Sequence, residues 1–153
     1  MFHLTQYIVV RRDLPLEDIL PQACHAAGKA SFMWGVKLAR TNEPLPGPIT
    51  PDWGHPTRII RGSKNEGRLR KLAGILTAHR IDFVTITEPD EGPLKGQMTA
   101  LALFPGEKET LAPLLNDFQN LRWKDVPSFP GGGAPPPQGE VGSNPAPGAN
   151  SPT

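Results

Sequence analysis

The stretch "QMTALALF" (residues 97–104) decides the fold class of this chain. After its first residues it is apolar on both faces of an extended strand, which is typical of a strand in the middle of a sheet. The stretch "DFVTIT" (82–87) alternates as a strand should, and no helical pattern separates the two. Because a direct connection permits antiparallel pairing, these segments predict an antiparallel pair in which residues 97–104 form the central strand.

Strand and helix patterns alternate before this pair. "TQYIVVRR" (5–12) and "TRIIRG" (57–62) are predicted strands. An alanine-rich helix is predicted between them, beginning near Pro21, which suits a first helical turn, and ending near Arg40. Strands separated by a helix favour parallel pairing, so these two strands are expected to be parallel neighbours.

Two further helices complete the predicted order. Ser63 and Glu66 have the spacing of a capping box, and apolar residues at helical spacing follow as far as His79. A last helix is predicted over residues 106–121, with Pro113 as an irregularity in its middle. The order β-α-β-α-β-β-α predicts an α/β sandwich of two or three layers, in which helices flank a mixed four-stranded sheet.

The chain of 153 residues is long enough for one domain with a modest core. From residue 126 to 153 it is rich in proline and glycine and has few apolar residues, so this segment is predicted to be a disordered tail. The folded domain is therefore predicted to span residues 1–125. A second Pro/Gly-rich segment, 42–56, is predicted to be a long loop inside that domain.

Charge and composition exclude several classes of protein. Sixteen Lys and Arg residues balance fifteen Asp and Glu residues, so only a local basic patch could bind nucleic acid. Cys24 is the single cysteine, so no disulfide forms within the chain, and no segment approaches the roughly 18 apolar residues of a membrane span. We expect a soluble cytoplasmic protein. The four histidines lack metal-ligand spacing and no glycine-rich phosphate loop is present, so no metal or cofactor is expected.

One polar stripe runs along the alanine-rich helix. Gln22, His25 and Lys29 are three and four residues apart and therefore share a helix face. They form either a functional site or the solvated side of a helix whose alanines and Met33 pack on the sheet. Cys24 and His25 are not expected to act as nucleophile and base, because neighbouring helical residues point in different directions. Cys24 is expected to be a small buried apolar residue.

Two more clusters could carry function. Glu88, Asp90 and Glu91 follow the strand 82–87, and Thr99 lies early in the next strand. This group is either a functional loop or an ordinary acidic turn. A basic segment could contact phosphates or could be a solvated helix face, and it contains Arg58, Arg61, Lys64, Arg68, Arg70 and Lys71.

Three quoted segments together resemble the type 2 peptidyl-tRNA hydrolases, in particular a divergent bacterial branch. They are "YIVVRRDL", "QACHAA" and "EPDEGPLKGQMTALAL", and the order of elements matches over about residues 5–122. The resemblance implies an enzyme that cleaves the ester between a peptide and the terminal ribose of tRNA. It also implies that tRNA is the partner, and that a homodimer is possible.

The resemblance implies a polar site made of a helix glutamine and histidine, an acid and a threonine. By position these are Gln22, His25, either Glu88 or Asp90, and Thr99. The basic segment would contact the acceptor stem of tRNA. The chain departs from the family pattern at three places: Asp18 replaces a lysine, Gln97 replaces a serine, and Glu-Pro-Asp replaces Asp-Ala-Gly. The alternative is a relative that no longer hydrolyses and instead binds tRNA, a nucleotide or a protein partner.

Overall fold

Four strands form the body of the sheet in the computed structural model, which describes residues 4–44 and 56–122. They are β1 (Leu4–Arg11), β2 (Thr57–Ser63), β3 (Phe83–Thr87) and β4 (Met98–Leu103). Two short strands, β5 (Gly106–Glu107) and β6 (Gln119–Asn120), pair with β1 and β2 at the margins. The main order is β3-β4-β1-β2-β6. The predicted mixed sheet of four principal strands is therefore confirmed, and the two short strands extend it.

The pairing follows from the connections along the chain. β1 and β2 are parallel, as expected for strands joined through a helix. β3 and β4 are antiparallel, and β4 also pairs antiparallel with β1. Every residue of β4 is buried, which confirms that its apolar character on both faces marked a central strand.

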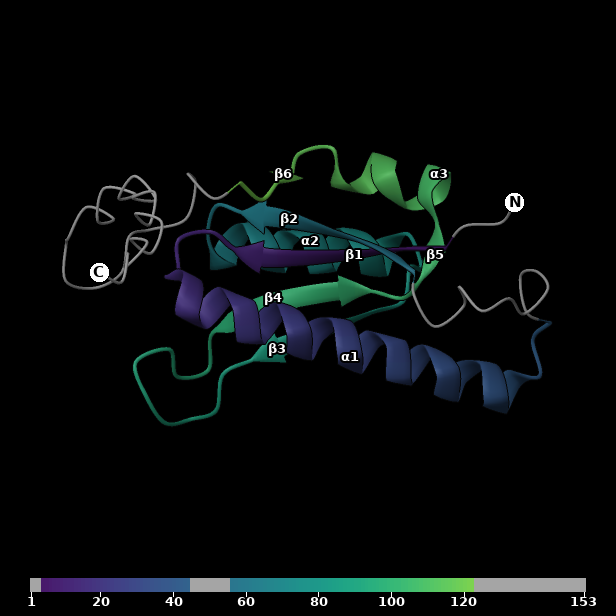
Figure 1. Cartoon of the computed structure of the whole chain (residues 1–153), viewed down its shortest axis with the longest axis horizontal. Coiled ribbons are helices and arrows are strands. Elements are labelled where there is room, and N and C mark those ends of the chain that lie inside the picture. Colours follow the sequence, from purple (N-terminus) through teal and green to yellow (C-terminus); the bar gives the residue numbers. More distant parts are fainter. Residues whose placement is uncertain (1–3, 45–55, 123–153) are drawn as a thin grey trace, which may run out of the picture.

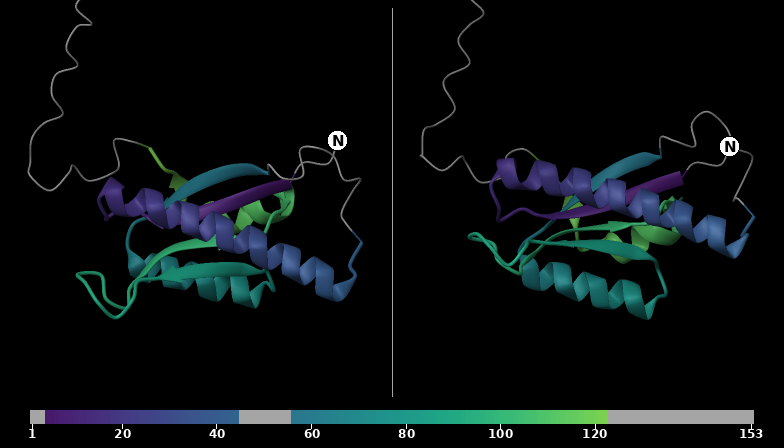
Figure 2. Two further views of the ribbon diagram at one scale, coloured as in Figure 1. Left: turned by 60° about the horizontal axis from the view of Figure 1, so that its bottom comes forward. Right: turned by 90° about the horizontal axis from the view of Figure 1, so that it is seen from below.

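Helices cover both faces of the sheet, so the fold has three layers (Figure 1 and Figure 2). Helix α1 (Leu16–Thr41) lies on one face, where its alanines pack against Ala100 and Ala102 of β4. Helix α2 (Glu66–Ala78) lies on the other face together with the short helix α3 (Lys108–Leu111) and the 3-10 helix η2 (Ala112–Leu115). Small side chains on both surfaces let α1 approach the sheet closely.

Helix α1 begins earlier than the sequence indicated. It starts at Leu16, not near Pro21, because Ile19 is also buried on the sheet and extends the packing face by one turn. Pro21 therefore lies inside the helix, where it cannot donate to the carbonyl of Glu17. Both residues are exposed, so water can hydrate that carbonyl.

Two side chains on α1 were placed wrongly from sequence. Cys24 is exposed and not buried, and Met33 is 41% exposed and does not join the packing face. The packing face of the helix is narrower than its alanine-rich composition implies, because its buried residues are Ile19, Ala23, Ala26, Ala27 and Ala30.

The start of α2 also differs from the predicted capping box. The N-cap is Asn65, whose side-chain oxygen accepts a hydrogen bond of 3.0 Å from the backbone N–H of Arg68. Ser63 is the last residue of β2, and its hydroxyl donates to the carbonyl oxygen of Asn65. Since β2 continues as far as Ser63 to pair with β1, that residue cannot also begin the helix.

The predicted last helix over residues 106–121 is too long, since only residues 108–115 are helical, as α3 and η2. Gly106 and Glu107 pair with β1 instead, and Pro113 lies near the start of η2, where its missing N–H breaks the α-helical ladder. Leu111, Leu115 and Phe118 are nevertheless buried with the leucines of α2. We call this cluster the α2-side core, and the cluster around the alanines of α1 the α1-side core. The predicted tail, 126–153, and most of the predicted loop 42–56 lie outside the described residues. No helix in residues 4–44 or 56–122 is both long enough and apolar enough to cross a membrane.

Candidate active site

One edge of the sheet collects the polar residues that the sequence singled out. β1, β2 and β3 run in the same direction, so their carboxyl ends meet at this edge, next to the first residue of β4. Helix α1 starts shortly after β1, so its first turns lie beside the same edge (Figure 1). Ligands of open α/β sheets bind beyond the carboxyl ends of the strands. We call this region the carboxyl edge.

Gln22, Glu88 and Thr99 meet at the carboxyl edge. The side-chain nitrogen Nε2 of Gln22 donates a hydrogen bond of 2.5 Å to Oε1 of Glu88. The hydroxyl of Thr99 lies 3.5 Å from the same carboxylate oxygen and 3.4 Å from the carbonyl oxygen of Ile86. Among the described residues, the side-chain oxygen Oε1 of Gln22 is buried and has no hydrogen-bond partner. We name these three residues the Glu88 cluster.

A β-bulge directs Thr99 toward this cluster. Between the pairs Ile86–Ala100 and Thr87–Met98, β3 advances by one residue and β4 by two, so Thr99 is the extra residue. Met98 then packs in the α2-side core while Ala100 packs in the α1-side core. Regular alternation would place residues 98 and 100 on one face. The bulge thus changes which face each side chain occupies at the start of β4, as bulges near active sites commonly do.

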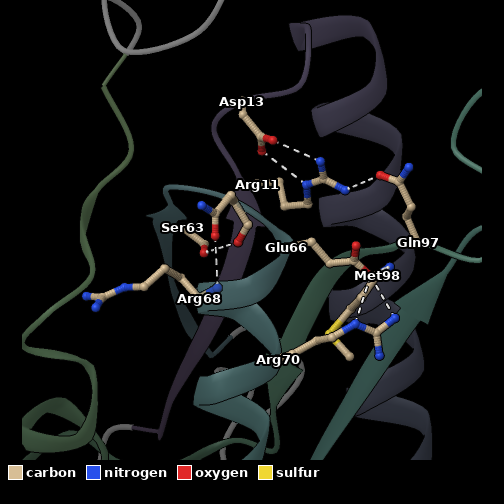
Figure 3. A network of polar contacts seen from close by, with 9 residues as sticks. Arg11, Asp13, Ser63, Glu66, Arg68, Arg70, Gln97 and Met98 are labelled. Carbon is tan, nitrogen blue, oxygen red and sulfur yellow. Dashed lines mark hydrogen bonds and ion pairs between the residues drawn. The ribbon is translucent and has the colours of Figure 1, made fainter.

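A second network holds the start of β4 from the other side (Figure 3). The buried guanidinium of Arg11 donates 2.7 Å to the side-chain oxygen of Gln97 and forms an ion pair of 2.8 Å with Asp13. The carboxylate of Glu66 accepts a hydrogen bond of 3.0 Å from the backbone N–H of Met98 and pairs with Arg70. Residues 97 and 98 are therefore anchored immediately before the bulge.

These contacts shift two pKa values in the directions expected for ion pairs. The hydrogen bond from Met98 lowers the pKa of Glu66, and Arg70 lowers it further, while burial opposes both. The hydrogen bond with Asp13 raises the pKa of Arg11, again against an opposing effect of burial. Both groups are thus held in their charged forms.

The family of the chain follows from a sequence comparison. A family model described as Peptidyl-tRNA hydrolase PTH2 matches residues 4–121. The chain belongs to the peptidyl-tRNA hydrolase PTH2 family. No curated protein matches this PTH2 chain. It is similar to a solved structure of a protein of unknown function from Agrobacterium tumefaciens strain C58, with 16% identity and a TM-score of 0.48, over 80% of this chain and 100% of that chain.

Two further residues predicted for the PTH2 site lie outside the Glu88 cluster. His25 is exposed on α1, one turn after Gln22. Asp90 is exposed in the turn between β3 and β4 and makes no hydrogen bond or ion pair within residues 4–44 and 56–122. Lys29, the last member of the predicted stripe, donates to the backbone carbonyl of Thr85 over 3.1 Å. Of the two acids that the resemblance left open, only Glu88 contacts Gln22 and Thr99.

The predicted tRNA-binding residues of this PTH2 chain divide into two groups. Arg58 donates to the side chain of Gln6, and Arg61 donates to the carbonyl oxygen of Phe118, so both are engaged inside the domain. Lys64, Arg68 and Lys71 are exposed.

Two polar residues at the edge escaped the sequence analysis. Arg11 joins the network that anchors β4, and Arg12 lines a pocket with Lys64 and Arg68. The signal that could have found them is the run "RRD" (11–13), which places charges directly after a buried strand.

Proposed function

We propose that this chain is a hydrolase that cleaves the ester bond between a peptide, or an aminoacyl group, and the terminal ribose of tRNA. Membership of the PTH2 family supports this reaction class. The observation that carries the proposal is the Glu88 cluster, because it presents a carboxylate and two hydrogen-bond donors at the edge where α/β sheets bind ligands. The same proposal places the protein in the cytoplasm with tRNA as its partner and allows a homodimer.

Glu88 is the proposed general base. Gln22 and Thr99 both contact its oxygen Oε1, and among the described residues no donor contacts Oε2. Oε2 can therefore accept a proton from a water molecule as that water attacks the ester carbonyl carbon. The tetrahedral intermediate collapses when the bond to the ribose oxygen breaks. The protonated Glu88 returns the proton to that oxygen, which completes the proton balance.

Gln22 and Thr99 have two roles in this mechanism. In the structure they hold the carboxylate of Glu88 in place. The amide nitrogen of Gln22 has a second hydrogen, which can donate to the oxyanion that develops on the substrate carbonyl. The proposed mechanism needs neither a serine nor a cysteine nucleophile.

The direct test uses two substrates and two measurements. The purified chain is incubated with peptidyl-tRNA and, separately, with a neutral ester that contains no RNA. Release of the peptide and retention of tRNA are both measured. We expect turnover of peptidyl-tRNA and little or none of the neutral ester. Equal turnover of both esters would contradict a tRNA-specific hydrolase.

A second candidate function is binding without hydrolysis, to tRNA, a nucleotide or a protein partner. The observation that favours it is Asp18, which places a carboxylate one helical turn before Gln22, where the resemblance implies a lysine. A carboxylate there cannot supply the positive charge of a lysine beside a developing oxyanion. Retention of tRNA without release of peptide, in the same experiment, would support this candidate and exclude the first.

A further inference from the structure

A pocket lies at the carboxyl edge, beside the ends of β1 and β2. It measures about 360 Å³, within the range of small-molecule sites. Its walls come from four parts of the chain: the residue after β1, the end of β2, the first turn of α2 and the segment before β6. The lining residues are Arg12, Gly62, Lys64, Asn65, Arg68, Asp117, Phe118 and Gln119. We name this hollow the basic pocket.

Three cationic side chains line the basic pocket. Arg12, Lys64 and Arg68 form no ion pair with any carboxylate in the described part of the chain. Asp117 also lines the pocket, and within those same residues it pairs with none of the three. The whole chain carries a net charge of only +1, so this unneutralised positive charge is a local feature. Such a concave cluster of one sign attracts an anion.

The shape of the pocket also suits an anion. The guanidinium of Arg68 lies 5.9 Å from the centre of the Phe118 ring, which limits the directions that it can take. Gly62 has no side chain to crowd the pocket wall. An added Cβ atom would lie 3.3 Å from Leu121 and 3.5 Å from the side chain of Arg12. Arginine side chains bind phosphate through two parallel hydrogen bonds, so Arg12 and Arg68 are suited to a phosphate group.

We propose that the basic pocket binds a backbone phosphate of tRNA, a few nucleotides from the ester bond. The choice of tRNA rests on the proposed function. The Glu88 cluster lies at the carboxyl end of β3 and the amino end of β4, and the basic pocket lies at the carboxyl ends of β1 and β2. These four strands are neighbours in one sheet. Two or three strand spacings amount to about 10–15 Å. The terminal nucleotides of an acceptor end can span that distance, so one RNA strand can occupy both sites.

The test measures RNA binding by the full chain, using an RNA hairpin that copies the acceptor stem and its single-stranded 3′ end and carries no ester. The variant is Arg12→Ala with Arg68→Ala. The matched control is Arg40→Ala with Lys108→Ala, which removes the same charge at the opposite edge of the sheet. We expect the pocket variant to bind roughly tenfold more weakly and its salt slope to fall by about 0.7–0.9 per lost phosphate contact. The control should retain both values.

Three results would overturn the proposal: equal affinity and salt slope in the two double variants, no RNA binding by the unmodified chain, or competition by inorganic phosphate as strong as that by the RNA. Because the RNA lacks an ester, the outcome is independent of hydrolysis. If the pocket variant loses affinity while the unmodified chain fails to cleave peptidyl-tRNA, the pocket stands and the proposed hydrolase activity falls.

Discussion

At the scale of single residues, the backbone decides which of two carboxylates is held by neighbouring side chains. The N–H of Glu88 donates to the carbonyl of Gln97 over 2.9 Å, and the N–H of Gly96 donates back to the carbonyl of Glu88. These bonds continue the β3–β4 pairing for one residue and fix the Glu88 side chain opposite Gln22. Asp90 lies two residues further along, in the exposed turn. The position of each residue in the β3–β4 hairpin therefore decides that the carboxylate of Glu88 is hydrogen-bonded and that the carboxylate of Asp90 is exposed to solvent.

The first prediction compares these two acids. Glu88→Gln should lower the turnover of peptidyl-tRNA by about 10²–10⁴-fold, because an amide cannot accept the proton of the attacking water. Asp90→Asn should leave turnover within about twofold, because its carboxylate contacts none of the proposed site residues. Steady-state hydrolysis measured side by side checks both. The roles of the two acids are wrong if Asp90→Asn is the variant that loses activity.

The second prediction compares neighbours on α1. Gln22→Ala should lower kcat by about 10²–10³-fold, the usual effect of removing one donor to an oxyanion. Its stability should change little because Gln22 is only partly buried. Cys24→Ser should leave both turnover and stability unchanged, because the side chain is exposed. A strong loss of activity in Cys24→Ser would contradict a mechanism without a cysteine nucleophile.

At the scale of elements, α2 supports the strand that carries Thr99. The carboxylate of Glu66, in the first helical residue, reaches the N–H of Met98 in β4. Arg11 reaches Gln97 from the end of β1. The start of β4 is thus held by a helix and a strand that are far from it in sequence. This cross-connection is what makes the bulge at Thr99 a defined conformation and not a frayed strand end.

The third prediction concerns the pH dependence of this connection. The folded state lowers the pKa of Glu66, so its ionised form stabilises the fold. That contribution is present above the unfolded pKa of about 4.3 and is lost as the pH falls through the lower folded pKa. Glu66→Gln should therefore reduce the free energy of unfolding by about 1 kcal/mol at pH 7, because a charge-assisted hydrogen bond becomes a neutral one.

Chemical denaturation of both proteins from pH 7 down to about pH 3 measures this difference. The gap between the two unfolding free energies should be constant near neutral pH and should close below about pH 4. A gap that is the same at all pH values would show that charge on Glu66 is not what stabilises the start of β4.

At the scale of the whole molecule, two cores share one sheet. The α1-side core combines alanines with β-branched residues, while the α2-side core contains the leucines of α2 together with Leu111, Leu115 and Phe118. All buried members of both cores lie within residues 4–121, the same range that the PTH2 family model matches.

The fourth prediction follows for truncation. A chain that ends at residue 125 should keep its unfolding free energy within about 0.5 kcal/mol, because the segment removed is rich in proline and glycine and offers few apolar residues to bury. It should also keep the peptidyl-tRNA turnover of the full chain. Denaturation and hydrolysis assays of the two lengths provide the comparison. A marked loss of stability on truncation would mean that residues 126–153 pack on the domain and that the proposed boundary is misplaced.

The sequence alone determined which segments become the four principal strands and how these connect. Apolar character on both faces identified the central β4, and the direct link to β3 identified an antiparallel pair, because both are local properties of hydrophobic burial and chain connection. The same local patterns failed where two interpretations competed. Ser63 had the composition of a helix cap but was needed in β2, and residues 106–121 had helical spacing but were interrupted by Pro113.

Only the tertiary structure decided the site. Gln22, Glu88 and Thr99 are separated by up to 77 positions along the sequence, and no periodicity distinguishes Glu88 from Asp90. The choice depends on the extra residue in β4, which moves Thr99 to the α1 side, and on the anchors of Gln97 and Met98 from Arg11 and Glu66. Such contacts depend on how distant segments pack, whereas strand and helix patterns depend on neighbours in the chain. The sequence could therefore identify the candidate residues but could not show which of them lie in contact.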